Sequence, residues 1–173
     1  MTVPLFVPTA HAAYANLSAD QTTHLGAGDH VAWNVSALAA GTDLSQACVV
    51  LDTTSPYSNA SGAASVGRFT LLGNGANVYN LRSLLMVANP ILTYEVAWYD
   101  ATNDVEIGRR APLGAVKIGV GINAIFKPTR YECSALIRPA TTILAEVRLM
   151  ISPGAPTAGI LAAYASAIVF RLS

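Results

Sequence analysis

The residue types best suited to acid–base chemistry gather in one short stretch of the chain. All three histidines, His11, His24 and His30, fall within the first thirty residues, and histidine changes its charge near neutral pH. Asp20 and Asp29 stand close to them in sequence, and a distant serine would complete a Ser-His-Asp set, because such triads need only spatial proximity. No Gly-x-Ser-x-Gly elbow is present to hold a nucleophile. We therefore expect loop histidines and no catalytic residue.

A cluster of oxygen-bearing side chains between residues 100 and 106 fits either a calcium site or a turn. The candidate metal ligands are Asp100, Asn103 and Asp104. An EF-hand loop needs glycine at its sixth position and glutamate at its twelfth, where this chain has Val105 and Ala111. Since Asn and Asp also form turns, the sequence favours a hairpin between strands at Leu92–Tyr99 and Val105–Arg109. Metal binding is the weaker alternative.

Gly119, Gly121 and Ala124 match the dinucleotide-binding pattern Gly-x-Gly-x-x-Ala. That pattern binds a cofactor only where the glycines lead from a strand into a helix. Here apolar residues alternate from Val116 to Phe126, which predicts one continuous strand through the glycines. We expect no cofactor.

Arginine outnumbers lysine eight to two, and Arg109-Arg110 is the only adjacent basic pair. Arginine favours bidentate, partly buried contacts, which suits an interface. Ordinary surface arginines explain the same pair, and both interpretations stay open. Cys48 and Cys133 form no Cys-x-x-Cys motif, and we expect two free, buried thiols, although the sequence leaves a single bridge between them open.

Apolar and polar residues alternate along most of the chain after residue 75, as in half-buried strands. Six segments have this pattern: Tyr79–Val87, Leu92–Trp98, Val116–Phe126, Tyr131–Ile137, Ile143–Ile151 and Ile168–Leu172. Earlier strands are expected at Val31–Ala40 and Ala47–Leu51. Residues typical of turns separate the segments. Short strands at this spacing predict a β-sandwich or barrel.

The same alternation predicts which side chains face the core. In the last segment Ile168, Phe170 and Leu172 are expected to point inward and Arg171 outward. Glu146 and Arg148 are expected to point away from the core, opposite the apolar odd-numbered positions of their segment. The core of the sandwich should therefore be made by one face of each strand.

The composition limits the classes of protein to which the chain belongs. Its 173 residues suit one domain, and its zero net charge argues against nucleic-acid binding through a basic field. The long uncharged stretch from Leu149 to Phe170 is interrupted by Pro153 and Pro156, so we expect no membrane span. Only 12% of residues are charged, against about 25% in an average soluble domain. Such a chain is poorly protected against association, so some apolar faces should be buried against other chains.

One stretch in the middle of the chain has a recognisable motif. Gly67-Arg-Phe69-Thr70, followed by Gly75 and Val78-Tyr79-Asn-Leu81, resembles the signature of C1q/TNF-like jelly rolls. The ending Ser166–Leu172 is similar to the last strand of that family. The resemblance implies an all-β jelly-roll sandwich that assembles as a trimer. Such domains occur in extracellular signalling ligands, in capsid-decorating cement proteins and in fibre heads.

We therefore expect an N-terminal arm at residues 1–9 and a single jelly-roll domain at residues 10–173. The chain has no collagen-like stem and no coiled-coil heptads, and Pro4 and Pro8 interrupt the apolar start, which has no basic residue of a signal peptide. These features favour a phage capsid decoration protein over a signalling ligand. It would be made in the host cytoplasm and located on the virion surface, with itself and the major capsid protein as partners.

The residues expected at its interfaces come from the arm, the arginine pair and an exposed tyrosine. They are Pro4, Phe6, Pro8, Arg109, Arg110 and Tyr164. No catalytic residue, cofactor, metal, nucleic acid or membrane is needed for this role. Two alternatives stay open. One is a fibre or spike head that binds a host receptor or glycan through the Gly41–Gly67 loop, and the other is a small jelly-roll enzyme using a histidine and an acid near residues 20 to 30.

Overall fold

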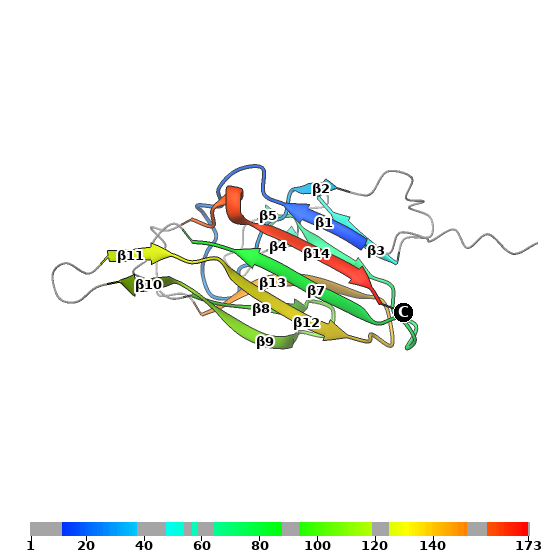
Figure 1. The fold of residues 1–173 in the computed structure, drawn as a ribbon. Helices are drawn as coiled ribbons and strands as arrows, with labels where there is room; N and C mark the ends of the chain where they lie inside the picture. The colour runs from blue at the N-terminus through cyan, green and yellow to red at the C-terminus, as the bar shows by residue number, and fades with distance from the viewer. Residues whose placement is uncertain are drawn as a thin grey trace, which may run out of the picture.

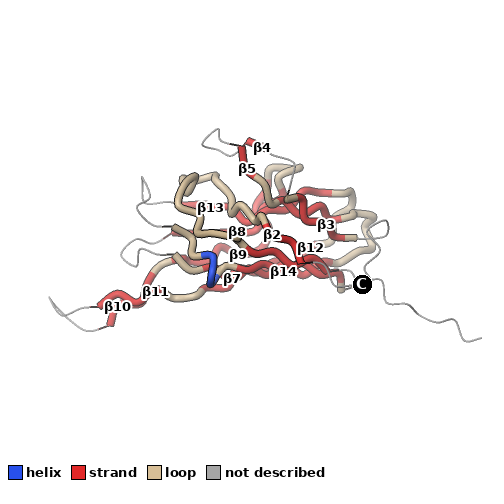
Figure 2. Tube along the Cα trace, turned by 90° about the horizontal axis from the view of Figure 1, so that it is seen from above, coloured by secondary structure: helices blue, strands red, loops and turns tan. Residues whose placement is uncertain are grey.

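The computed structural model describes residues 12–37, 48–53, 57–58, 64–87, 94–118, 125–151 and 159–172. The expected arm, with Pro4, Phe6 and Pro8, lies outside these residues, as do His11 and most of the Gly41–Gly67 loop. The described residues form two five-stranded antiparallel sheets that pack face to face (Figures 1 and 2). The expected all-β jelly-roll sandwich is confirmed.

The first sheet has the strand order β12-β7-β14-β1-β2. Its strands are β12 (Tyr131–Ile137), β7 (Tyr79–Leu85), β14 (Ser166–Arg171), β1 (Ala12–Asn16) and β2 (Val35–Ala37). In Figure 1 β12, β7, β14 and β1 lie at the front of the molecule. The sheet brings the two ends of the described chain together, because β1 pairs with β14.

The second sheet has the order β3-β6-β13-β8-β9. Its strands are β3 (Val49–Asp52), β6 (Arg68–Leu71), β13 (Ile143–Ile151), β8 (Tyr94–Asp100) and β9 (Val105–Leu113). Two small hairpins stand beside the sandwich: β4 (Tyr57–Ser58) with β5 (Ala64–Ser65), and β10 (Ala115–Ile118) with β11 (Ile125–Pro128). A 3₁₀ turn at Ala162–Tyr164 precedes β14.

Alternate side chains from both sheets fill the space between them. On β7 the inward residues Tyr79, Leu81 and Leu85 are fully buried. The rings of Phe69 and Trp98 lie 5.6 Å apart at an angle of 60°, a tilted packing that aromatic pairs favour. The Trp98 indole nitrogen also donates a hydrogen bond to the carbonyl of Cys133 on the opposite sheet. Both cysteines are buried thiols, as expected, and form no disulfide with each other.

Two of the strand predictions are wrong. Val116–Phe126 is not one strand, because β10 and β11 pair antiparallel with Ile118 opposite Ile125; apolar alternation continues through both arms of a hairpin, so the pattern does not reveal the reversal. The residues of the dinucleotide pattern, 119–124, lie outside the described residues. Near the N-terminus the strand begins at Val35 and not at Val31, although the backbone of Val31 is hydrogen-bonded to Val147.

The last predicted strand is present as β14, but the prediction of which side chains face the core is wrong. Ala167 and Val169 are buried, whereas Leu172 is 53% exposed. Val169 lies opposite Leu81 and Ala13, two fully buried residues of the neighbouring strands. This register turns Ile168 and Phe170 to the outer face of the sheet, because side chains alternate along a strand.

The described residues contain no helix long and apolar enough to cross a membrane.

Candidate interaction surface

The outer face of the first sheet presents its side chains in three rows. Strand pairing places Tyr14, Ile168, Arg82 and Ser134 side by side in the middle row. One flanking row holds Asn16, Ser166, Leu84 and Glu132, and the other holds Ala12, Phe170, Asn80 and Leu136. Neighbours on one face of adjacent strands lie about 5 Å apart, so each row is a continuous surface across four strands. We call this surface the open face.

Apolar side chains dominate the part of the open face that lies over β1, β14 and β7. Tyr14 is 44% exposed, and Ile168, Phe170 and Leu84 are partly exposed. A groove of about 320 Å³ runs between Tyr14, Leu84 and Ile168 and is bordered by Arg82 and Glu132. Apolar side chains that form a contiguous patch on a sheet face are typical of a protein interaction site.

An ion pair forms one border of this apolar area. The Arg82 guanidinium donates to both carboxylate oxygens of Glu132, with 2.8 Å for each nitrogen–oxygen distance. This fork holds the pKa of Glu132 below its ordinary value. Because both side chains are well exposed, water screens the pair and it adds little to stability. It fixes the orientation of two charges at the edge of an apolar surface.

The two sheets meet closely where β9 passes β12. Gly108 has φ +81°, and a Cβ there would lie 2.9 Å from both the Ala135 Cβ and the Ser134 carbonyl oxygen. Glycine is therefore required both for the backbone conformation and for the close approach. A second, more open groove of about 650 Å³ lies at this junction, lined by Asn80, Arg82, Gly108, Arg109, Glu132, Ser134, Ala135 and Leu136.

The two adjacent arginines on β9 differ in their contacts. Arg110 is bonded to Glu106, with a nitrogen–oxygen distance of 3.0 Å, and to Glu95 at 3.4 Å. Arg109 is exposed and lines the second groove, and its side chain makes no ion pair with any residue that the structure describes. Arg110 is held by two carboxylates, whereas Arg109 is not, so Arg109 is the arginine better placed to bind a partner of the chain.

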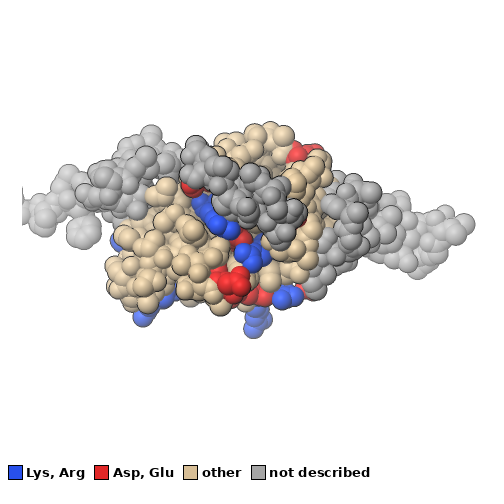
Figure 3. Space-filling model, turned by 180° about the vertical axis from the view of Figure 1, so that it is seen from behind, with Lys and Arg blue, Asp and Glu red and all other residues tan. Residues whose placement is uncertain are grey.

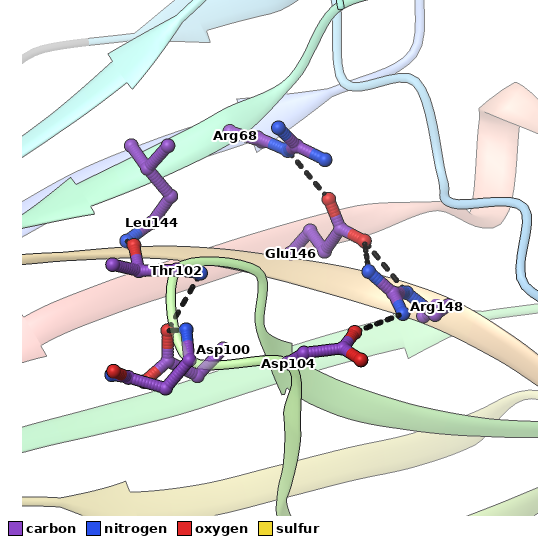
Figure 4. A network of polar contacts seen from close by, with 8 residues as sticks. Arg68, Asp100, Thr102, Asp104, Leu144, Glu146 and Arg148 are labelled. Atoms are coloured by element: carbon purple, nitrogen blue, oxygen red, sulfur yellow. Dashed lines mark hydrogen bonds and ion pairs between the residues drawn. The ribbon is translucent and has the colours of Figure 1, made fainter. Parts of the chain in front are cut away.

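The outer face of the second sheet has a buried carboxylate, Glu146, on its central strand β13. Acidic and basic side chains gather on this side of the molecule (Figure 3). Glu146 is 1% exposed and accepts hydrogen bonds from Arg68 at 2.7 Å and from Arg148 at 2.7 and 2.8 Å (Figure 4). The Arg148 guanidinium lies 3.5 Å from the centre of the Tyr99 ring, which is a cation–π contact. We call this surface the charged face. Glu146 does point away from the core, but its partners remove it from water.

The candidate metal ligands form a hairpin turn, as the sequence favoured. The Asp100 carboxylate accepts hydrogen bonds from the backbone nitrogens of Thr102 and Asn103 and from the Asn103 side chain. Asp104 instead accepts from the Tyr99 hydroxyl at 2.8 Å and lies 3.7 Å from Arg148. Among the described residues no group of three or more acidic, histidine or cysteine side chains is placed to hold a metal. The turn joins β8 to β9.

His30 and Asp29 lie close to the charged face and are both 1% exposed. The backbone from Gly28 to Val31 pairs with β13, where His30 lies opposite Arg148. Burial lowers the pKa of His30 to about 4, with opposing contributions from the neighbouring acids and arginines. Its ring is therefore neutral near pH 7, and its burial keeps it away from any substrate.

The remaining members of the possible catalytic set have structural contacts. Asp20 accepts a hydrogen bond from the backbone nitrogen of Ala162 at 2.7 Å, at the start of the 3₁₀ turn. Gln21, which the sequence did not single out, bonds the carbonyls of His24 and His30 and the nitrogen of Ala32. His24 is exposed with φ +55°. Tyr164, an expected interface residue, is 45% exposed at the end of the 3₁₀ turn.

No family model and no curated protein matches the sequence. Among solved structures, the chain is similar to that titled "Structure of Eiger TNF from S. frugiperda". The similarity covers 95% of this chain and 94% of that chain, with a TM-score of 0.55 and 12% sequence identity. The fold is a TNF-like jelly roll. At this identity the likeness concerns the fold alone.

The sequence pattern does not predict the open face. It places Ile168 and Phe170 in the core and gives no sign that Tyr14 and Leu84 lie beside them. The opposite assignment of faces in the last strand would identify these residues. In that assignment Ala167 and Val169 face the core beside Ala13 and Ala15. Small residues fill the inside of this part of the sheet, and large apolar residues lie outside.

Proposed function

We propose that the chain is a structural protein of a virus particle, which assembles as a homotrimer and decorates the capsid of a phage. The observation that carries the proposal is the open face, an exposed apolar surface across β1, β14 and β7. A jelly roll with such a face buries it most economically against copies of itself, because closed symmetric assembly satisfies the same patch on every subunit. The TNF-like fold supports the trimer as its form.

The proposed capsid role requires binding and no catalytic chemistry. Decoration requires a compact assembly that binds across subunit junctions and stabilises the shell by mass action, through RT ln(1 + [L]/Kd) for each site. The charged residues near residues 20 to 30 and 100 to 104 have structural contacts within the chain. This observation favours the structural role over the alternative of a small enzyme.

The arm at residues 1–9 is the proposed contact with the major capsid protein. It would anchor each subunit while the open face holds the three subunits together. The alternative of a fibre head depends on the Gly41–Gly67 loop, most of which lies outside the described residues.

The experiment has two readouts on one protein. Light scattering after gel filtration is expected to give three times the chain mass of 18.0 kDa, and a monomer at micromolar concentration would contradict the proposal. The same trimer should co-sediment with purified heads of the phage that encodes it. Deleting residues 1–8 should leave the trimer intact and reduce the protein bound per head, and unchanged binding would show that the arm is not the anchor.

A further inference from the structure

Most arginines of the chain have a partner within it. Arg68 and Arg148 bond Glu146, Arg82 bonds Glu132, and Arg110 bonds Glu95 and Glu106. Arg171 donates to Cys48 and Asn77. The other three arginines make no ion pair with any described residue, and they are Arg109, Arg130 and Arg138.

The three arginines whose side chains bond no described residue belong to one edge of the molecule. Arg109 is on β9, the edge strand of the second sheet, and Arg130 and Arg138 immediately precede and follow β12, the edge strand of the first sheet. β9 and β12 pack against each other at Gly108 and Ala135. All three arginines are exposed. They are spread over the length of β12, which at seven residues is about 20 Å.

The same edge offers an apolar contact. Leu136 is 64% exposed, more than the other large apolar side chains described, and it lines the open groove together with Arg109, Asn80 and Ser134. An exposed leucine beside arginine and hydrogen-bonding side chains is the composition of a protein–protein interface. A purely polyanionic ligand would have no use for the leucine.

We propose that the β9–β12 edge, formed by Arg109, Arg130, Arg138 and Leu136, binds an acidic surface of another protein. Guanidinium groups pair with carboxylates through two parallel hydrogen bonds, which gives both attraction and orientation. Glu132 lies on β12 between Arg130 and Arg138, and Glu106 precedes Arg109 on β9. These carboxylates interrupt the row of positive charge that would bind the continuous phosphates of a nucleic acid. Individual carboxylates of a protein surface can be placed to avoid them. This inference concerns the β12 end of the open face and the neighbouring strand β9, beside the apolar part over β1, β14 and β7 that the proposed trimer would bury, and it holds whether or not the chain is a capsid protein.

The adjacent arginines of β9 supply a matched pair of variants. Arg109→Gln and Arg110→Gln change the net charge equally and differ in position by one residue, but only Arg109 lines the groove. The probe is a fluorescent poly-L-glutamate peptide, and binding is followed by fluorescence anisotropy at low salt. The unaltered chain should bind it and release it as salt is added, because screening weakens exposed charge pairs.

Arg109→Gln should weaken binding about two- to fivefold, as for an exposed ion pair. The triple variant that also carries Arg130→Gln and Arg138→Gln should lose about tenfold or more by the same reasoning. Arg110→Gln should bind as the unaltered chain does. Leu136→Ser should leave the binding of poly-L-glutamate unchanged, because this peptide has no apolar side chain to contact the leucine.

Three results would overturn the inference. One is no binding of poly-L-glutamate by the unaltered chain. Another is an equal loss in the Arg109 and Arg110 variants, which would make the effect one of net charge alone. The third is binding of heparin or duplex DNA at the same edge with poly-L-glutamate left unbound, which would assign the edge to another class of ligand. Melting curves of each variant confirm that the fold is retained.

Discussion

The outer faces of the two sheets differ in what surrounds their aromatic side chains. Tyr14 lies beside Ile168 on the first sheet, and Tyr99 lies beside Arg148 on the second. On the charged face Glu146 is 1% exposed and is bonded to two arginines, one of which covers the Tyr99 ring. On the open face Tyr14 is 44% exposed and its neighbours in the middle row are Ile168 and then Arg82.

The difference shows what each face requires from outside the chain. The charges of Arg68, Arg148, Glu146 and Asp104 pair with one another within the chain, so these side chains need no partner from another subunit. The open face exposes apolar area whose removal from water is worth about 25 cal/mol per Å², and in the proposed trimer a second chain would supply that gain.

Glu146→Gln should destabilise the fold by about 3 to 4 kcal/mol, because it leaves the charges of two partly buried arginines without a carboxylate. Glu132→Gln is the matched control on the open face, where the same change affects an exposed pair and should cost less than about 1 kcal/mol. Urea unfolding of the two variants measures both values. Equal losses would remove the distinction between the faces.

Acid should destabilise the fold through His30. The folded pKa of about 4 lies below the ordinary value of 6.5, so the unfolded chain binds the proton more tightly. This contribution is complete above pH 6.5 and is lost as the pH falls towards 4, to a total of about 3 kcal/mol. His30→Asn should flatten the dependence of unfolding free energy on pH in this interval.

His24→Asn is the control for that titration, since His24 is exposed and asparagine tolerates its positive φ. If the two histidine variants have the same slope between pH 4 and 6.5, the burial of His30 does not govern the response to acid.

Gly108→Ala should cost about 2 kcal/mol through backbone strain and the close approach of β12. Gly75 also has a positive φ, of +71°, but a Cβ there would meet nothing within 4 Å. Gly75→Ala should therefore cost only about 1 kcal/mol, for the conformation alone. Thermal unfolding compares the two, and a smaller loss at Gly108 would mean that the edge between the faces is less tightly packed than described.

The sequence predicted the sandwich because alternation of apolar residues is a local signal. In β12 the pattern gave the correct faces, with Cys133 and Ala135 inside. It failed in β14, where both faces are apolar and only the pairing with Leu81 and Ala13 decides between them. Such a choice depends on residues more than eighty positions away.

Local sequence patterns also do not predict the ion pairs of the two faces. Glu146 alternates like a solvent-exposed residue, and its burial depends on Arg68, which lies 78 positions earlier. The Arg109-Arg110 pair is visible in the sequence. Which of the two arginines is held in ion pairs depends on the positions of Glu95 and Glu106 in the fold. The residue types were visible in the sequence, and their partners were set by the fold.

The most direct test of the central contrast is the mass in solution of two charge-introducing variants. Ile168→Glu places a carboxylate on the open face, and Val50→Glu places one on the outer face of the second sheet, where Val50 is 39% exposed. Light scattering should show a trimer for the unaltered chain and for Val50→Glu, and a monomer for Ile168→Glu. A trimer that survives Ile168→Glu, or that is lost equally in both variants, would contradict the assignment of the open face.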